Sequence, residues 1–136
     1  MGTDCVICRD GGPLDAIAEL PTTWVAAPSR APLPGYLCVV AKRHVVEPFQ
    51  LDEPDLTAFW NESMAIAAAL HELVQPTKMN YEIHGNTIPH LHLHLFPRFE
   101  GDPFQGRPID GRSRDFRRSP EEIARLAAAI ARRSPS

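Results

Sequence analysis

Three histidines alternate with leucines in one short segment of the chain, His90-Leu91-His92-Leu93-His94-Leu95. In a β-strand, successive side chains point to opposite faces of the sheet, so this spacing places the three imidazoles on one face. The leucines on the other face are enough to bury the strand, which leaves the histidines without a packing explanation. The chain holds only six histidines, so three in strict alternation indicate a functional site.

Two kinds of chemistry can use such a row of imidazoles. Two histidines at this spacing can bind the same metal ion. Alternatively, a neutral imidazole can attack an electrophile while a neighbouring imidazole handles the proton. The alternation alone is compatible with both.

A second group of reactive residue types lies near the start of the sequence, where Cys5 and Cys8 form a Cys-x-x-Cys motif within residues 1–12. Such a pair can bind zinc, form a redox couple or remain two unpaired thiols. The chain has three cysteines, and an odd number disfavours a complete disulfide framework. We therefore expect a reducing, cytoplasmic environment.

The histidine strand needs neighbouring strands to hold it. The segment 36–41 is apolar throughout, which predicts a strand at the centre of a sheet. Alternating or β-branched residues bounded by turn residues predict the others. The expected strands are 13–20, 22–27, 36–41, 79–84 and 90–97.

Two helices are expected to pack on this sheet. Apolar residues at three- and four-residue spacing predict a long helix over 52–74, with Asp52 as its cap and Pro54 in its first turn. Ser119 followed by Glu122 is a capping box that predicts a C-terminal helix. Between the sheet and this helix, residues 98–118 carry six arginines and four acidic residues and are expected to form an irregular loop.

The composition limits the possible functions. A chain of 136 residues has room for one compact domain, and these elements make it an α+β domain. The net charge of −3 argues against binding a nucleic acid polymer, which requires clustered basic residues. No apolar run approaches the roughly 20 residues of a membrane helix, so we expect no membrane partner.

The segment from Asn80 to Phe104 resembles the histidine triad (HIT) family, whose signature is three histidines alternating with apolar residues. The resemblance extends to Cys5 and Cys8 and to a strand that ends at His44, features of a zinc-containing bacterial-type branch. It implies a HIT-like fold, with an antiparallel five-stranded sheet, one long helix and a C-terminal helix. A single domain would span 1–136, with 1–12 as a Cys-x-x-Cys knuckle and 98–136 as a variable loop plus the C-terminal helix.

The resemblance also implies an activity. The protein would be a nucleotide hydrolase that cleaves a nucleoside phosphoramidate or a dinucleoside polyphosphate through a covalent nucleotidyl intermediate on His92. His94 would contact the phosphate and the leaving group, while Asn86 and Thr87 would bind the phosphoryl oxygens. The alternatives are a nucleotidyl transferase or phosphorylase, and a nucleotide- or metal-binding module without turnover.

Two further properties come with the resemblance. A structural zinc ion would be held by Cys5, Cys8, His44 and His90, which form a closed tetrahedral Cys₂His₂ set. The chain would also form a homodimer through its long helix and a strand.

The sequence departs from the family pattern at two places. Many members have a histidine after Pro-Gly before the central strand, and this chain has Tyr36, whose hydroxyl could replace it. Many members place an acidic or amide residue on the ribose, and the corresponding position here is Pro28 or Ala27. Recognition of the ribose is therefore open, and so is whether His84 contacts substrate or faces solvent.

Overall fold

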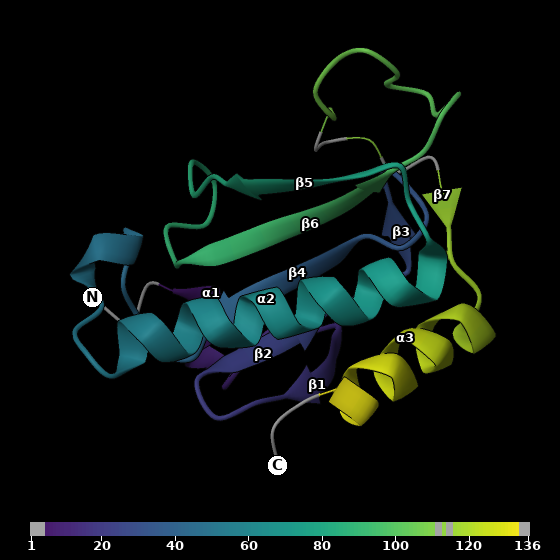
Figure 1. Ribbon diagram of the computed structural model, residues 1–136. Helices are drawn as coiled ribbons and strands as arrows, with labels where there is room; N and C mark the ends of the chain where they lie inside the picture. Colours follow the sequence, from purple (N-terminus) through teal and green to yellow (C-terminus); the bar gives the residue numbers. More distant parts are fainter. Residues whose placement is uncertain (1–4, 111–112, 114–115, 134–136) are drawn as a thin grey trace.

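The main sheet has five antiparallel strands, as predicted. The structure, a computed structural model, describes residues 5–110, 113 and 116–133. Its strand order is β1-β2-β4-β6-β5, which places the apolar strand β4 at the centre (Figure 1). The strands are β1 (Ala16–Glu19), β2 (Thr23–Ala26), β4 (Leu37–Ala41), β5 (Lys78–Ile83) and β6 (His92–Arg98).

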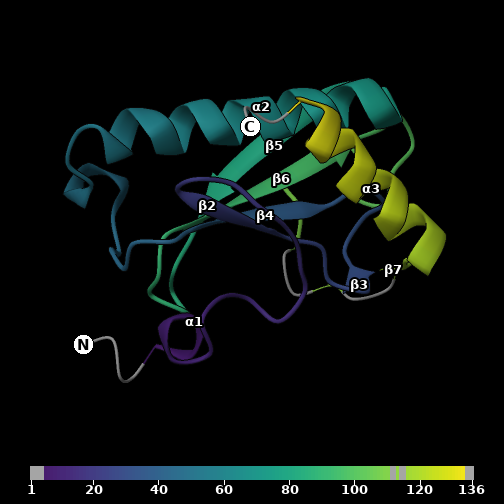
Figure 2. The ribbon, with the colours of Figure 1, turned by 90° about the horizontal axis from the view of Figure 1, so that it is seen from below.

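The helices lie on both sides of this sheet. Helix α2 (Asp55–Val74) crosses one face with α3 (Pro120–Arg133) beside it, and the single-turn helix α1 (Val6–Arg9) lies on the opposite side (Figure 2). A short 3-10 helix, η2 (Pro48–Gln50), precedes α2. Among the helices of the described residues, none is long and apolar enough to span a membrane.

The leucines of the histidine segment face α2. Leu91, Leu93 and Leu95 are at most 2% exposed and belong to one apolar core with Phe59 and Leu70 of α2. This burial is the packing role predicted for the leucine face, and it fixes the opposite face of β6 as the one that carries His92 and His94.

Strand β4 is apolar throughout because it contributes to two cores. Leu37 and Val39 pack in the core under α2, whereas Cys38 and Val40 pack in a second core on the opposite face. The loop that follows β6 covers part of this second core with Phe104. A strand buried on both faces loses the alternation of polar and apolar residues.

The predicted cap of the long helix is wrong. Helix α2 begins at Asp55, and the carboxylate of Glu53 accepts hydrogen bonds from the backbone N–H of Thr57 (2.9 Å) and from its hydroxyl (2.7 Å). Asp52 instead lies 3.8 Å from Arg43. The longer glutamate side chain reaches a free N–H of the first turn that Asp52 does not bind.

The segment 98–118 contains structure that the sequence did not predict. Strand β7 (Phe116–Arg117) pairs with β3 (Arg30–Ala31) in a separate two-stranded sheet. Strands of two residues are too short to show a periodic pattern. Arg118 is buried and donates from Nε to the carbonyl of Pro28 at 3.0 Å. Of the six arginines, Arg112 and Arg114 lie outside the described residues.

Asp102 anchors the start of this segment. Its carboxylate accepts hydrogen bonds from Nε of Arg98 (2.9 Å) and from the backbone N–H groups of Phe99 (3.1 Å) and Phe104 (2.8 Å). The two charged side chains are 13% and 5% exposed, so solvent screens them little. Arg98 lowers the pKa of the Asp102 carboxyl below its usual value.

We expect Asp102→Asn to lower the free energy of unfolding by about 2–3 kcal/mol, because it leaves Arg98 buried without its anion. Since the folded pKa is lowered, the stabilisation is present above the ordinary aspartate pKa of about 3.9 and is lost as the pH falls through the lowered value. Urea unfolding at pH 7 measures the change. The control Asp10→Asn, in the exposed pair with Arg9, is expected to cost under about 0.5 kcal/mol. Equal costs for both variants would contradict this role of Asp102.

Candidate functional site

His92 and His94 lie side by side at the beginning of β6. The centroids of the two rings are 4.8 Å apart and the ring planes meet at 84°. Strand β6 begins at His92, two residues later than predicted. His90 therefore precedes the strand. It is 1% exposed, and its ring contacts the thiols of the two N-terminal cysteines.

A backbone carbonyl fixes the tautomer of His92. Nδ1 of His92 lies 2.6 Å from the carbonyl oxygen of His90, which can only accept a hydrogen bond. The proton of the neutral imidazole is therefore on Nδ1, and Nε2 carries the lone pair. An unprotonated ring nitrogen is what a nucleophile or a metal ligand requires.

His94 has the opposite arrangement. The hydroxyl of Tyr36 lies 2.6 Å from Nδ1 of His94, and the two rings stack with centroids 5.8 Å apart. When the hydroxyl donates to Nδ1, the ring proton is on Nε2, and His94 becomes a donor. Tyr36 thus contacts the third histidine from the position where the sequence departs from the family pattern.

Cys38 lies beside these residues but is not reactive. It is opposite His94 in the register of β4 and β6 and is buried. Burial raises the pKa of its thiol to about 12, so the reactive thiolate is not formed near neutral pH. Cys38 is therefore a small apolar residue of the second core.

The two histidines line a cleft of about 730 Å³. Asn86 and Thr87, predicted to bind substrate, lie on its wall, as does His84. Pro28 lines the cleft too, and it is one of the two positions, with Ala27, at which the family pattern predicts a ribose-binding residue. The full lining is Pro28, Arg30, Pro32, Tyr36, His84, Gly85, Asn86, Thr87, Ile88, His92, His94, Phe96, Ile109 and Asp110.

Sequence reasoning missed part of this lining. Arg30 lies on the two-residue strand β3, and Ile109 and Asp110 lie in the segment after β6. These residues reach the cleft through loop conformation, which leaves no periodic signal in the sequence. A cationic and an anionic side chain in the lining give the cleft polar groups besides its histidines.

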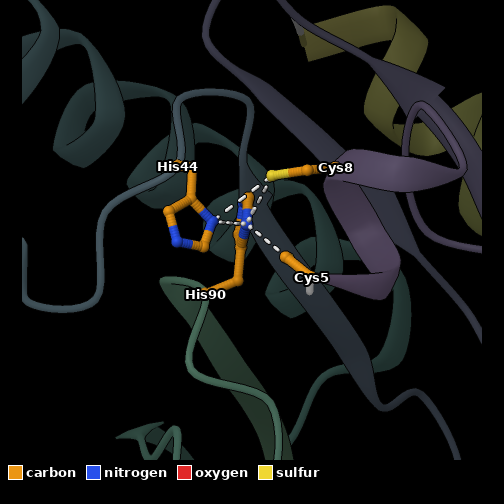
Figure 3. A group of neighbouring side chains, drawn as sticks. All are labelled: Cys5, Cys8, His44 and His90. Atoms are coloured by element: carbon orange, nitrogen blue, oxygen red, sulfur yellow. Dashed lines mark hydrogen bonds between the residues drawn. The ribbon is translucent and has the colours of Figure 1, made fainter. Parts of the chain in front are cut away.

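The four predicted metal ligands meet at one point. The ligand atoms of Cys5, Cys8, His44 and His90 all lie within 4.8 Å of one another, and their side chains converge in Figure 3. Nδ1 of His90 lies 3.4 Å from Sγ of Cys5, 3.6 Å from Sγ of Cys8 and 3.1 Å from Nδ1 of His44. These residues come from the α1 segment, the loop after β4 and the approach to β6.

The donor chemistry of the cluster fits zinc. Nε2 of His90 lies 2.6 Å from the carbonyl oxygen of Ala41, so its proton is on Nε2 and the Nδ1 lone pair points at the other ligands. Ligand bonds of about 2.0–2.3 Å in a tetrahedral site place the ligand atoms about 3.3–3.8 Å apart. Four of the six pairs here lie at 3.1–3.6 Å, close to that range. Burial and the adjacent Cys5 raise the pKa of the Cys8 thiol, so two thiolates here need a cation.

The fold and this cleft define an α+β protein in which an imidazole with its lone pair on Nε2 and a donor imidazole lie next to a Cys₂His₂ cluster. The family profile described as the HIT domain matches residues 12–101. The chain belongs to the HIT domain family.

Relatives and solved structures agree with this assignment. An uncharacterized HIT-like protein from Mycoplasma genitalium is 31% identical over 71 residues, which cover 48% of this chain and 50% of that protein. The chain thus matches about half the length of this curated relative. A histidine triad protein from Bradyrhizobium japonicum superposes with a TM-score of 0.78 at 29% identity, covering 88% of this chain and 90% of that one. A zinc-bound histidine triad protein from Mycobacterium smegmatis has a TM-score of 0.69 and 25% identity, covering 97% and 96%.

Proposed function

We propose that the protein is a nucleotide hydrolase that cleaves a phosphoramidate or phosphoanhydride bond through a covalent nucleotidyl intermediate on His92. The observation that carries this proposal is the hydrogen bond from Nδ1 of His92 to the carbonyl of His90. It leaves Nε2 as the nucleophilic atom of a side chain that lines the cleft.

In the first step Nε2 of His92 forms a bond to phosphorus while the bond to the leaving group breaks in line with it. The imidazole becomes positively charged, and the His90 carbonyl at Nδ1 stabilises that charge. In the second step a water molecule attacks phosphorus and gives up one proton, and the electron pair of the P–N bond returns to Nε2. The nucleoside monophosphate is released and His92 is again neutral.

The other predicted site residues support the phosphoryl group. His94, whose Nδ1 is bonded to Tyr36, presents Nε2–H to a phosphoryl or leaving-group oxygen. Asn86 and Thr87, in the loop between β5 and β6, supply further donors from the cleft wall. Donors fixed before the reaction stabilise the developing charge without reorganisation. Pro28 offers no side-chain hydrogen bond to a ribose hydroxyl, so the nucleoside must be held by other groups of the cleft.

Incubation with adenosine phosphoramidate and with a diadenosine polyphosphate tests the proposal. Release of adenosine monophosphate in water is expected from at least one substrate. If added inorganic phosphate led to release of adenosine diphosphate in place of adenosine monophosphate, the protein would be a transferase instead. Binding of both substrates without turnover would leave the protein as a binding module and overturn the proposal.

Replacing Tyr36 with phenylalanine tests the support of His94. We expect kcat to fall about 10-fold because the tautomer of His94 is no longer fixed, with KM changed by less than about 3-fold. Tyr36→His, which restores the residue common in the family pattern, is expected to recover most of the rate. A Tyr36→Phe variant with the wild-type kcat would show that the hydroxyl has no such role.

We propose that the Cys₂His₂ cluster holds one structural zinc ion, as the zinc-bound relative from Mycobacterium smegmatis suggests. The four protein ligands fill a tetrahedral site and leave no position for substrate. Reduced Cys5 and Cys8 suit a reducing compartment, and we place the protein in the cytoplasm. Elemental analysis of protein purified without chelators is expected to give one zinc per chain. A stoichiometry near zero, in protein also unable to take up added zinc, would contradict the site.

We propose that two copies of the chain associate through α2 and β5. Strand β5 is an edge of the main sheet, and Tyr81 on β5 and Met64 on α2 are 47% and 42% exposed. Both residues line a groove of about 630 Å³ between these elements, and a symmetric dimer would cover it. Tyr81→Arg is expected to convert a dimer to a monomer in sedimentation experiments. A wild-type monomer at micromolar concentration would contradict the dimer.

A further inference from the structure

A histidine outside the triad, His84, lies in the same cleft. It follows β5 directly, and its ring centroid is 5.5 Å from that of His94. Its Nε2 lies 2.8 Å from a carboxylate oxygen of Glu82. Glu82 and His84 are two residues apart, so both side chains point to the face of the sheet that carries the triad. Glu82 is directly opposite His94 in the pairing of β5 with β6.

The carboxylate determines which nitrogen of His84 can accept a proton. An ionised carboxylate only accepts hydrogen bonds, so the proton of neutral His84 is on Nε2 and the lone pair is on Nδ1. In the part of the chain that the structure describes, the bond to Glu82 is the one side-chain hydrogen bond of His84. A histidine oriented by a carboxylate through one nitrogen can act as a base through the other.

The imidazoles that line the cleft differ in whether they can accept a proton during the second step. In the covalent intermediate Nε2 of His92 is bonded to phosphorus, so it cannot accept a proton. His94 presents Nε2–H when Tyr36 donates to its Nδ1, so it is a donor. His84 is the imidazole that remains to accept a proton from an attacking water molecule.

We propose that His84, oriented by Glu82, is the base that activates the water molecule in the second step. This inference rests on the proposed nucleotidyl intermediate. As the water oxygen bonds to phosphorus, one water proton moves to Nδ1 of His84 and the P–N electron pair returns to His92. The protonated His84 is half-exposed (53%) and passes the proton to solvent or, in the next turnover, to a leaving group that requires one.

The experiment separates the two steps with the p-nitrophenyl ester of adenosine monophosphate as the probe. p-Nitrophenolate leaves without needing a proton, so formation of the intermediate does not depend on His84. Its release in the first turnover reports the first step. The second step is followed as the decay of the adenylylated protein, measured by intact mass after quenching in alkali, where phosphohistidine survives.

For His84→Ala we expect first-turnover release within about 2-fold of wild type and adduct decay slowed about 100-fold. Added imidazole is expected to restore part of the decay rate, because it replaces the missing base. Glu82→Gln is expected to slow decay about 10-fold or more, since it keeps His84 but removes the anion that orients it. The exposed residues Arg125 and Glu121 of α3 provide the matched controls Arg125→Ala and Glu121→Gln, which are expected to behave as wild type.

The possible failures are distinguishable. Adduct decay at the wild-type rate in His84→Ala would overturn the role of His84 and leave the proposed function intact. A folded His84→Ala protein that forms no adduct would place His84 in the first step and also overturn the inference. A wild-type protein that turns the ester over without any adduct would instead contradict the proposed function.

Discussion

His92→Ala is expected to lower kcat for a nucleotide substrate by about 10⁴-fold or more. Alanine removes the atom that forms the bond to phosphorus, and His94 at a ring-centroid distance of 4.8 Å cannot replace it while Tyr36 holds it as a donor. The other residues that line the cleft are unchanged, so affinity for adenosine monophosphate is expected to remain within about 3-fold. Steady-state kinetics and calorimetric titration measure the two quantities.

The matched control for His92→Ala is Arg125→Ala, an exposed substitution on α3. It is expected to keep the wild-type kcat. Circular dichroism of His92→Ala is expected to be unchanged, because His92 is only partly buried and the leucine face of β6 carries the packing. A His92→Ala variant with kcat within 10-fold of wild type would show that another group is the nucleophile.

The second large effect is expected on stability. Cys8→Ser is expected to abolish zinc binding and lower the free energy of unfolding by about 3 kcal/mol or more. The cluster joins three segments distant in sequence, and His90 also donates to the carbonyl of Ala41. Without the cation, the two thiols and the Nδ1 atoms of His44 and His90, 3.1 Å apart, have no shared positive charge to hold them together.

Thermal unfolding with and without a strong chelator measures this contribution. The wild-type Tm is expected to fall by several degrees on chelation and to recover with added zinc, while Cys8→Ser is expected to respond to neither. Cys38→Ala is the control, because Cys38 is buried but is not one of the four clustered ligands, and its variant is expected to retain zinc. A wild-type Tm that does not depend on the chelator, in protein shown to have lost its zinc, would contradict a structural role.

The strongest sequence patterns predicted the elements that position the site. The His-Leu alternation predicted which face of β6 carries imidazoles, and the apolar segment 36–41 predicted the central strand. Three- and four-residue spacing predicted α2 to within a few residues of its start. These elements are predictable because burial of a sheet face or helix face imposes a period on the sequence.

Contacts made by individual polar side chains were not predictable in the same way. Glu62 of α2 is 5% exposed, and its carboxylate accepts hydrogen bonds from the backbone N–H of Thr22 (3.1 Å) and the hydroxyl of Thr23 (2.6 Å). From the sequence, a charged residue at that helix position is expected to face solvent. It is buried because the turn between β1 and β2 packs against it. The position of Arg30 in the cleft was likewise not predictable, because it depends on where the two-residue strand β3 lies.

The four candidate metal ligands were predicted from the family resemblance, and the fold shows that their side chains converge. Cys5 and Cys8 alone were compatible with redox chemistry or unpaired thiols, because spacing within one segment does not identify distant partners. The structure brings His44 and His90 to them. The role of Glu82 and His84 could not be predicted from the sequence, because it depends on their position beside His94. That position is known only from the register of β5 and β6.

The most direct test of the nucleophile is to trap and locate the covalent intermediate. Wild-type protein is mixed with the p-nitrophenyl ester of adenosine monophosphate, quenched in alkali, digested and sequenced by mass spectrometry. The proposed function predicts one adenylate group, on His92 and on no other residue, and its absence from His92→Ala. An adduct on a different residue, or turnover with no adduct in rapidly quenched samples, would contradict nucleophilic attack by His92.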